Sequence, residues 1–552
     1  MKKKPERSPD SPVPAIDRRS FLGSLGTGAA AMAVTSLPLP WSSGSAHAAE
    51  VDPVTGEERQ LAAFAIRRDA AQLAYDRGVP DHPDNGDEAA YPTRFASYSK
   101  GLPHNALGEV DGSAYDALLS ALGSGDRKAF ETIPMGLGRK LTNPQAGLAF
   151  DLEGPDSHQM AIPPAPRFDS AQEAAEMGEL YWMALLRAEP FARFGHSAAV
   201  DQASADLSRF SDFRGPKAGG RVTSATIFRG FTAGDLVGPF VSQFLLKDIP
   251  FGSLTIVQRQ ETVRPVSYLT DYASWLNVQN GGPGEQIQID PRRRYIRNMF
   301  DLAHYVYVDA LYEAYLNACL ILIGMNAPLD SGNPYRSSST QIGFGTFGNP
   351  HILSLVTEVA TRALKCVWYQ KWFVHRRLRP EEFGGRVHNH LTGAASYPIH
   401  SEILNSSAVR SVFSRYGTYL LPMAFPDGCP THPAYGAGHA TVAGACVTIL
   451  KAWFDESFVI PDPVVANEDG FSLVPYKGPD AGSLTLGGEL DKVAANIAIG
   501  RNMGGVHWRS DYEESLKLGE AIAVGILEEE KACYSEQAAF TLTRFDGTTI
   551  TI

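Results

Sequence analysis

The sequence predicts a mainly α-helical protein, a large helical bundle with a few short β-strands and a C-terminal hairpin. Two observations lead to this fold class. Apolar residues recur at spacings of three and four over most of the chain, whereas alternating runs are short and few. The 552 residues are 44% hydrophobic and 20% charged, which is the composition of a globular protein rather than a disordered one.

The first 48 residues predict an export signal rather than part of the fold. Three lysines at positions 2–4 precede Arg18-Arg19, which stand in a segment that resembles the twin-arginine pattern. An apolar run follows, and Ala46-His47-Ala48 has the small residues of a cleavage site. We therefore expect a mature chain of 504 residues (552 − 48) in the periplasm or outside the cell. The alternative is a chance arginine pair in a disordered tail.

The mature chain is expected to have two parts, an N-terminal helical region with long loops over 49–290 and a helical bundle over 291–552. The helical period marks seven segments: 58–77, 170–187, 294–323, 352–377, 440–454, 490–502 and 510–533. A Gly/Pro-rich stretch over 133–162 predicts a long surface connection. Strands are predicted at 254–259, 540–545 and 548–552, the last two joined by an Asp546-Gly547 turn.

The segment 294–323 is apolar around almost its whole circumference, so we expect one helix that is buried on several sides. Asp301 and Asp309 lie inside it, and a buried carboxylate requires a cationic partner. Outside the signal, no stretch reaches about 18 uncharged apolar residues, so stable membrane insertion is not expected.

The formal net charge of −12 makes nucleic acid an unfavourable partner. An anionic ligand would need a local cluster of cations to overcome this global charge. Five cysteines without a CxxC pair are too few and too scattered for a disulfide scaffold or a zinc module. Most of them lie in helical stretches, as expected of small buried hydrophobic residues.

Cations and histidines gather in three segments that are far apart in the sequence. The first contains Lys371, His375-Arg376-Arg377 and Arg379. Arg379 precedes a proline, which is expected to end the helix there. A basic helix C-terminus also suits the helix dipole, and this alone would account for two or three of the charges.

The second segment is the loop and helix start from His432 to His439. Prolines and glycines keep it non-helical up to Gly438, where a helix rich in small residues begins. The free backbone N–H groups at a helix start form an anion site, and Gly438 lets a ligand approach the backbone closely.

The third segment joins Arg501, at the end of a helix, to His507 in the turn before the next helix. A lone histidine followed by tryptophan is more often a packed core residue, but Arg501 ahead of a glycine turn favours a ligand. Together the three segments supply fixed cations, a helix N-terminus and imidazoles. These groups suit a tetrahedral oxyanion of the phosphate or vanadate type, because arginine makes planar bidentate contacts and lysine supplies a point charge.

The sequence resembles the vanadium-dependent haloperoxidases, which are related to the type-2 phosphatidic acid phosphatases, through three motifs. These are Lys371-x7-Arg379-Pro380, Ala437-Gly438-His439 and Arg501-x5-His507. The likeness extends over about 294–507 and is closest to the bromoperoxidase branch, which has seven residues between the lysine and the arginine. The phosphatases usually have six.

The resemblance implies a vanadate cofactor and the residues that would hold it. His507 would be the axial ligand of vanadium. Lys371, Arg379, Arg501 and the backbone N–H of Gly438 would bind the equatorial oxygens and neutralise their charge.

The resemblance also implies the residues that assist the reaction. His439 would be the acid–base partner of the apical hydroxide, and Lys371 would polarise the bound peroxide. His432, the histidine typical of bromoperoxidases, would line the halide pocket together with Trp368. Asp309 would be the acidic residue that pairs with a histidine or arginine of the site.

Two points of this carry-over stay open. Asp301 is the alternative to Asp309 as the acidic partner. Ala437 replaces the serine that is usual in the family, so a hydroxyl that would hydrogen-bond an equatorial oxygen is absent. Such a bond contributes about 1.5–3 kcal/mol, and we expect weakened or retuned activity rather than its loss.

The implied activity is the oxidation of bromide, and more easily of iodide, by hydrogen peroxide to hypohalous acid, which halogenates a small organic acceptor. The relatives imply a homo-oligomer. One alternative is an acid phosphatase, in which His507 would be the nucleophile and His439 the acid. The other is an exported protein that binds an oxyanion without turnover, which only Ala437 supports.

Overall fold

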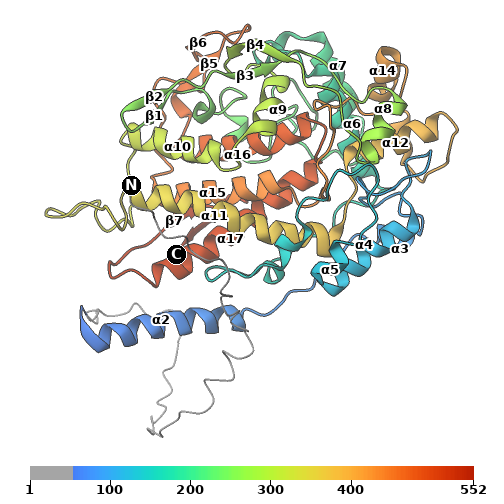
Figure 1. Cartoon of the computed structure of the whole chain (residues 1–552). Helices are drawn as coiled ribbons and strands as arrows, with labels where there is room; N and C mark the ends of the chain where they lie inside the picture. The colour runs from blue at the N-terminus through green and yellow to red at the C-terminus, as the bar shows by residue number, and fades with distance from the viewer. Residues whose placement is uncertain (1–53) are drawn as a thin grey trace, which may run out of the picture. The chain divides into compact units, whose positions relative to one another are not determined.

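The helix that follows the His432–His439 loop, α15 (Gly438–Trp453), lies at the centre of the core. The computed structural model describes residues 54–552, so the signal predicted for 1–48 lies outside the described residues. Every residue of α15 except His439 is buried. Three long helices pack around it: α11 (Asn349–Tyr369), α16 (Leu486–Met503) and α17 (Arg509–Lys531) (Figure 1). The predicted helical bundle is confirmed.

Helices α15 and α17 approach each other so closely that their crossing requires glycine. A Cβ atom on Gly519 would lie 2.0 Å from the carbonyl oxygen of Thr441, and one on Gly444 would lie 2.1 Å from that of Leu516. Because glycine has no Cβ, the two backbones can touch directly. The crossing fixes the first turn of α15, where the sequence predicts an anion site.

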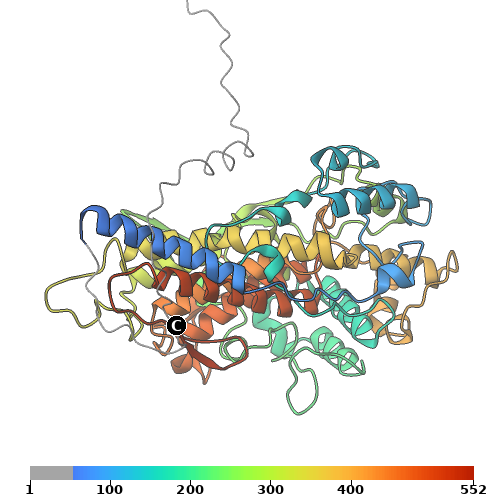
Figure 2. The same cartoon turned by 90° about the horizontal axis from the view of Figure 1, so that it is seen from below.

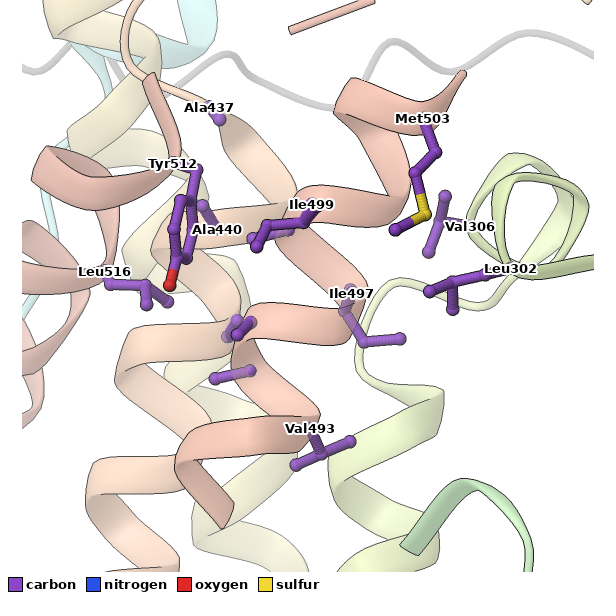
Figure 3. Packing of buried hydrophobic residues seen from close by; sticks show 14 of the residues in the cluster. Leu302, Val306, Ala437, Ala440, Val493, Ile497, Ile499, Met503, Tyr512 and Leu516 are labelled. Atoms are coloured by element: carbon purple, nitrogen blue, oxygen red, sulfur yellow. The ribbon is translucent and has the colours of Figure 1, made fainter. Parts of the chain in front are cut away.

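Helix α9 (Met299–Val308) packs against α16 at the level of the predicted site. Leu302 and Val306 face the side of α16 that carries Ile497 and Met503 (Figure 3). A Cβ on Gly500 would lie 3.1 Å from Val306, so this contact is also close. The end of α9 is thereby held beside the last turn of α16.

The prediction of one helix over 294–323 is wrong. Strand β4 (Ile289–Arg294) takes its first residue, and α9 is separated from α10 (Glu313–Gly324) by a break at which the axis bends by 100°. The backbone of Asp309 is extended, which ends α9. Both halves are apolar, so periodicity does not reveal the break. Within residues 54–552 no single helix has the length and hydropathy to cross a membrane, and α9 and α10 meet these criteria only when taken together.

The predicted helix over 352–377 also ends differently. Helix α11 continues into a π-helical turn (Gln370–His375), and Arg376 then adopts a left-handed conformation that stops it. Arg379 does not end this helix but caps the next one, α12 (Pro380–Leu391). Proline at the first helical position is favourable because the N–H it lacks would have no partner there. The π-helical turn carries Lys371.

The other helices surround this core. They are α2 (Gly56–Asp76), α3 (Asp87–Ala90), α4 (Gly112–Ser124), α5 (Arg127–Phe130), α6 (Ala171–Leu186), α7 (Ala198–Leu207), α8 (Tyr272–Gln279), α13 (Ser401–Leu404) and α14 (Ser407–Tyr416). Helix α2 has no buried residue and lies on the outside of the molecule (Figure 2). Helix α6 is almost wholly buried and packs against α14 and α16.

Within residues 54–552 the strands form four two-stranded antiparallel sheets. They pair as β1 (Ile249–Phe251) with β2 (Leu254–Ile256), β3 (Gln260–Val263) with β4, β5 (Val464–Ala466) with β6 (Leu473–Pro475), and β7 (Thr541–Thr543) with β8 (Thr549–Thr551). The predicted C-terminal hairpin and the strand at 254 are therefore confirmed, although each is shorter than predicted.

The N-terminal region shares the core of the C-terminal bundle. One hydrophobic cluster contains Tyr181 and Phe244 as well as Val442 and Ile497, so the boundary expected at 290 does not divide it. The predicted surface connection over 133–162 is only partly a surface feature. Gly147 is buried, and a Cβ there would lie 2.7 Å from the backbone nitrogen of Tyr369.

Candidate active site

The three sequence segments rich in cations and histidines converge at the N-terminal end of α15. Lys371 is on the π-helical turn, Arg379 is at the start of α12, Arg501 is in the last turn of α16, and His507 lies between α16 and α17. All of these side chains are buried. The tertiary structure therefore brings together residues that are up to 136 positions apart (507 − 371).

Two of the cations bind only backbone oxygens in their hydrogen bonds. Lys371 Nζ donates to the carbonyls of Pro433 at 2.8 Å and Ala434 at 3.0 Å. Arg501 Nη1 donates to the carbonyl of Val306 at 2.6 Å, and its Nε has no partner among the described residues. Both side chains therefore retain N–H groups for a ligand.

Arg379 connects two histidines of the site. It donates to the carbonyls of Val506 at 2.7 Å and His432 at 2.9 Å. It also donates to His432 Nδ1 at 2.8 Å and to His507 Nε2 at 3.0 Å. An arginine has no acceptor, so each of these ring nitrogens must present a lone pair.

The cations of this cluster have no carboxylate in direct contact within residues 54–552. Among residues 54–552, no carboxylate forms an ion pair with the side chain of Lys371, Arg379 or Arg501. Burial, and then the charge of Arg379, hold the pKa of Lys371 well below its usual range. Burial lowers the pKa of Arg501 to about 10. Buried charges of one sign are costly without a counter-ion, so the site is built for an anion.

His507 is fixed in one tautomer by its two neighbours. Its Nδ1–H donates to Asp511 Oδ2 at 2.8 Å, while Nε2 accepts from Arg379. Burial, and then the charges of Arg379 and Lys371, lower the pKa of His507 well below its usual range. The imidazole is therefore neutral, with a lone pair on the nitrogen that faces the cations. That is the form in which histidine binds a metal.

Sequence reasoning missed the residues behind His507. Asp511 also accepts from Arg377 Nη1 at 2.8 Å, and Arg377 contacts Glu173 and Glu176 of α6. Asp511 follows His507 by four residues at a helix start, and this spacing was the signal available in the sequence. Glu173 lies in the N-terminal region, and no local pattern connects it with the site.

His439 pairs with the carboxylate of Asp309. The two side chains are joined by a hydrogen bond of 3.0 Å between His439 Nε2 and Asp309 Oδ1. Asp301, the alternative partner, instead binds Arg297 at 3.0 Å. Burial lowers the pKa of His439, and the neighbouring Asp309 partly offsets this. Because Nε2 donates to Asp309, Nδ1 is the ring nitrogen left to exchange a proton.

His432 and Trp368 form one wall of the site. Their ring centroids are 4.8 Å apart, and Lys371 Nζ lies 5.6 Å from the centroid of Trp368. A Cβ on Gly438 would lie 3.1 Å from Trp368, so the indole covers the start of α15. Trp368 is held in place by a hydrogen bond of 3.1 Å from Nε1 to the carbonyl of Thr142.

The start of α15 lacks a side-chain cap. Ala437 is the residue before the helix and has no hydroxyl to accept from the first turn. Its own backbone N–H donates to Ser515 Oγ of α17 at 2.7 Å. The N–H of Gly438 is one of the unpaired donors at a helix start, as the sequence predicts.

Other candidate groups lie away from the site. Arg376 pairs with Glu88 at 2.7 Å, and the ring of His375 packs on Tyr435. All five cysteines are free, and only Cys533 is exposed. In the part of the chain that the structure describes, no three His, Cys, Asp or Glu side chains are arranged to hold a metal cation.

The chain is similar to proteins of known activity over nearly its whole length. It is 39% identical to a vanadium-dependent bromoperoxidase from Corallina pilulifera, over 90% of this chain and 99% of the relative. It is 36% identical to a vanadium-dependent bromoperoxidase from Ascophyllum nodosum, over 90% of this chain and 93% of the relative. The family model of the VCPO second helical-bundle domain matches residues 402–536.

The fold has a close counterpart among solved structures. The second vanadate-dependent bromoperoxidase of Ascophyllum nodosum, a homohexamer, superposes with a TM-score of 0.87 at 32% identity. The match covers 94% of each chain, so it includes the N-terminal region as well as the bundle.

Proposed function

Since the chain belongs to the vanadium-dependent bromoperoxidases, we propose that it binds vanadate between Lys371, Arg379, Arg501 and His507 and oxidises bromide and iodide with hydrogen peroxide. The product is hypohalous acid, which halogenates small organic acceptors. One observation supports this most strongly: three buried cations that form no ion pair within residues 54–552 gather at a neutral histidine, whose Nε2 lone pair accepts from one of them, Arg379.

The residues present fit vanadate in number and in kind. Vanadate is a tetrahedral oxyanion, and Lys371 and Arg501 retain N–H donors for its oxygens, while Arg379 would supply the N–H that it now donates to His507. His507 Nε2 would bind the vanadium atom. Arg379 donates to that same nitrogen, so this hydrogen bond must be exchanged for one to an oxygen when the group binds. Gly438 supplies a backbone N–H at a helix start.

Vanadate(V), when bound, acts as a Lewis acid that activates hydrogen peroxide toward halide without a change in its own oxidation state. The protein contributes positive charge and a proton carrier. Lys371, Arg379 and Arg501 would neutralise negative charge from buried positions, where each interaction is stronger than in bulk water.

His439 is the proton carrier of the proposed reaction. Asp309 holds its Nε2–H and thereby leaves Nδ1 to accept and return a proton at the cofactor side. Burial lowers the pKa of His439, which keeps the ring neutral and ready to accept a proton near pH 7. Asp309 then stabilises the imidazolium that forms.

His432 and Trp368 support the assignment of bromide rather than phosphate ester as substrate. Arg379 donates to Nδ1 of His432, so Nε2 carries the ring proton. Burial, and then the charges of Lys371 and Arg379, keep the pKa of His432 well below its usual range, and the ring is therefore neutral. A neutral N–H donor beside an indole face is suited to a large, polarisable halide.

The test is bromination of a phenolic dye by the purified mature chain with peroxide and bromide, with and without added vanadate. We expect vanadate-dependent bromination that is lost in His507→Ala together with bound vanadium. His388→Ala is the control, because this histidine contacts Tyr272 and Tyr419 instead of the site. Hydrolysis of an aryl phosphate without any bromination would contradict the proposal and favour a phosphatase.

We also propose export by the twin-arginine route to the periplasm or the cell exterior. The proposal rests on Arg18-Arg19 and on the small residues Ala46 and Ala48 of a cleavage site. That route carries folded proteins, which suits a chain that acquires a cofactor. Mass spectrometry of the exported protein should show an N-terminus after Ala48, and retention of the full chain in the cytoplasm would contradict it.

The bromoperoxidase of Ascophyllum nodosum supports a homo-oligomer for this chain, since that relative is a homohexamer and the match covers 94% of each chain. Exposed apolar side chains are available for such contacts. Phe64 of α2 is 64% exposed, and Ile342 and Phe344, in the loop between α10 and α11, are 86% and 72% exposed. Light scattering on the purified protein measures the number of subunits.

A further inference from the structure

A chain of buried polar contacts connects the site with helix α6 of the N-terminal region. It passes from His507 to Asp511, from Asp511 to Arg377, and from Arg377 to Glu173 and Glu176. The side chains of Asp511 and Glu173 are fully buried, and that of Arg377 is 2% exposed. Of these five side chains, only that of His507 hydrogen-bonds a cation of the anion site, Arg379, within residues 54–552.

Asp511 is held from two directions. Its Oδ2 accepts from His507 Nδ1 at 2.8 Å and from the backbone N–H of Trp508 at 3.1 Å. Its Oδ1 accepts from Arg377 Nη1 at 2.8 Å. The helix start and His507 thus hold one carboxylate oxygen, and Arg377 holds the other.

Arg377 is in turn held on several sides. Its Nη2 donates to Glu173, its Nη1 donates to Ser510 Oγ at 2.8 Å, and its guanidinium stacks 4.8 Å from the ring centroid of Trp508. The hydroxyl of Ser510 in turn donates a hydrogen bond to Glu176 Oε2 at 2.8 Å. Among the described residues, the second oxygen of Glu173 has no polar partner, so Glu173 is directed at Arg377 alone.

We propose that Arg377 and Glu173 are positioning residues: they orient Asp511, which keeps the proton of His507 on Nδ1 and the lone pair of Nε2 toward the oxyanion. This inference rests on the proposed function, because it assigns Nε2 as the ligand atom. It gives the N-terminal region, through α6, an indirect part in cofactor binding. Removal of such outer partners typically costs about 10- to 100-fold in metal affinity.

A second buried arginine–glutamate pair, between α17 and α6, offers a matched control. Arg509 of α17 donates to Glu179 of α6 at 2.5 and 2.8 Å, and both side chains are 2% exposed. This pair resembles the Arg377–Glu173 pair in chemistry and burial but makes no hydrogen bond to Asp511 among the described residues. A purely structural role would affect both pairs alike.

The experiment titrates orthovanadate into the mature chain by calorimetry, without peroxide or halide. We expect about a tenfold or greater loss of affinity in Arg377→Met, a partial loss in Arg377→Lys and Glu173→Gln, and a change within about twofold in Arg509→Lys and Glu179→Gln. Thermal unfolding of each vanadate-free variant shows whether its fold is retained. Correlations between histidine protons and ring nitrogens should show loss of the single Nδ1–H tautomer of His507 in Arg377→Met.

The inference is overturned if Arg377→Met binds vanadate within about twofold of wild type, or if Arg509→Lys and Glu179→Gln lose as much affinity as the Arg377 and Glu173 variants. A wild type that binds vanadate but does not oxidise bromide contradicts the proposed function alone, and the ratio between the two pairs still decides the inference. A wild type that binds no vanadate overturns both.

Discussion

At the scale of single residues, Ala437 lies where a hydroxyl would have two uses. As the residue before α15 it could cap the first turn, and in the family pattern it would bind an oxygen of the anion. Alanine does neither, and the backbone N–H of Ala437 is already used by Ser515. In the proposed function, the site would therefore hold its anion mainly through charge.

Ala437→Ser should increase both stability and anion affinity. A serine cap contributes about 0.5–2 kcal/mol to the free energy of unfolding. One more hydrogen bond to a charged oxygen, worth about 1.5–3 kcal/mol, would tighten vanadate binding about tenfold or more. Chemical denaturation and vanadate titration measure the two effects.

The control for this substitution is Ala440→Ser, one turn further along the same helix and equally buried. It adds the same hydroxyl inside the helix rather than at the capping position, so neither stability nor affinity should rise. Equal gains in both variants would show that position 437 has no special role.

Residue types could be assigned from the sequence, but their partners could not. The sequence identified Lys371, Arg379 and His507 because motif spacing is local. The choice of Asp309 over Asp301 needed the bend between α9 and α10, which turns Asp309 toward His439. Glu173 was missed because it lies 204 positions from Arg377.

At the scale of elements, the crossing of α15 and α17 determines where the anion site begins. Glycines at 444 and 519 allow the two backbones to touch, and the loop before α15 lies against Ser515 of α17. The same loop supplies the carbonyls that bind Lys371. The site is therefore sensitive to the spacing of these two helices.

Gly519→Ala should destabilise the protein. Its Cβ would lie 2.0 Å from the carbonyl oxygen of Thr441 and 2.6 Å from the nitrogen of Ala445, and both are backbone atoms that cannot move aside alone. Overpacking of this kind costs about 1–3 kcal/mol in the free energy of unfolding. Thermal or chemical denaturation measures the loss.

Gly123→Ala is the control and should change the free energy of unfolding in the opposite direction. Gly123 lies in α4, and a Cβ there would meet no atom within 4 Å. Alanine should stabilise this helix by about 0.5–1 kcal/mol relative to glycine. If the two variants changed stability in the same direction, the close crossing would not explain the effect of Gly519→Ala.

The predicted element boundaries were wrong where two helices meet without a change in composition. Residues on both sides of the α9–α10 bend are apolar, and the helix carrying Lys371 continues through a π-helical turn. Hydrophobic periodicity reports that a segment is helical and buried. It does not report the direction in which the next helix leaves.

At the scale of the whole molecule, the charge of the site opposes the charge of the chain. The sequence carries a net charge of −12, whereas the site collects three buried cations that form no ion pair with the carboxylates of residues 54–552. Without a bound anion, the burial of these charges lowers the free energy of unfolding. A bound oxyanion should therefore stabilise the whole fold.

Addition of vanadate should raise the melting temperature of the vanadate-free protein. At a concentration 100 times the dissociation constant, ligand binding adds about 2.7 kcal/mol to the free energy of unfolding. Scanning calorimetry measures the shift, which His507→Ala should reduce and His388→Ala should leave unchanged. Vanadate binding without any stabilisation would show that the unfolded chain binds vanadate as tightly as the folded protein does, which contradicts a site built by the fold.

The amino-acid sequence was sufficient to predict the helical class, the C-terminal hairpin and the cationic residues of the site. Periodicity, turn chemistry and motif spacing depend on residues that are close together in the sequence. The tertiary structure alone decided the partners of those residues: Asp309 for His439, and Asp511, Arg377 and α6 behind His507. The physical reason is that burial makes each charge depend on the nearest compensating group. Helix packing determines which group lies nearest, and the number of residues between two positions in the sequence does not indicate how the helices pack.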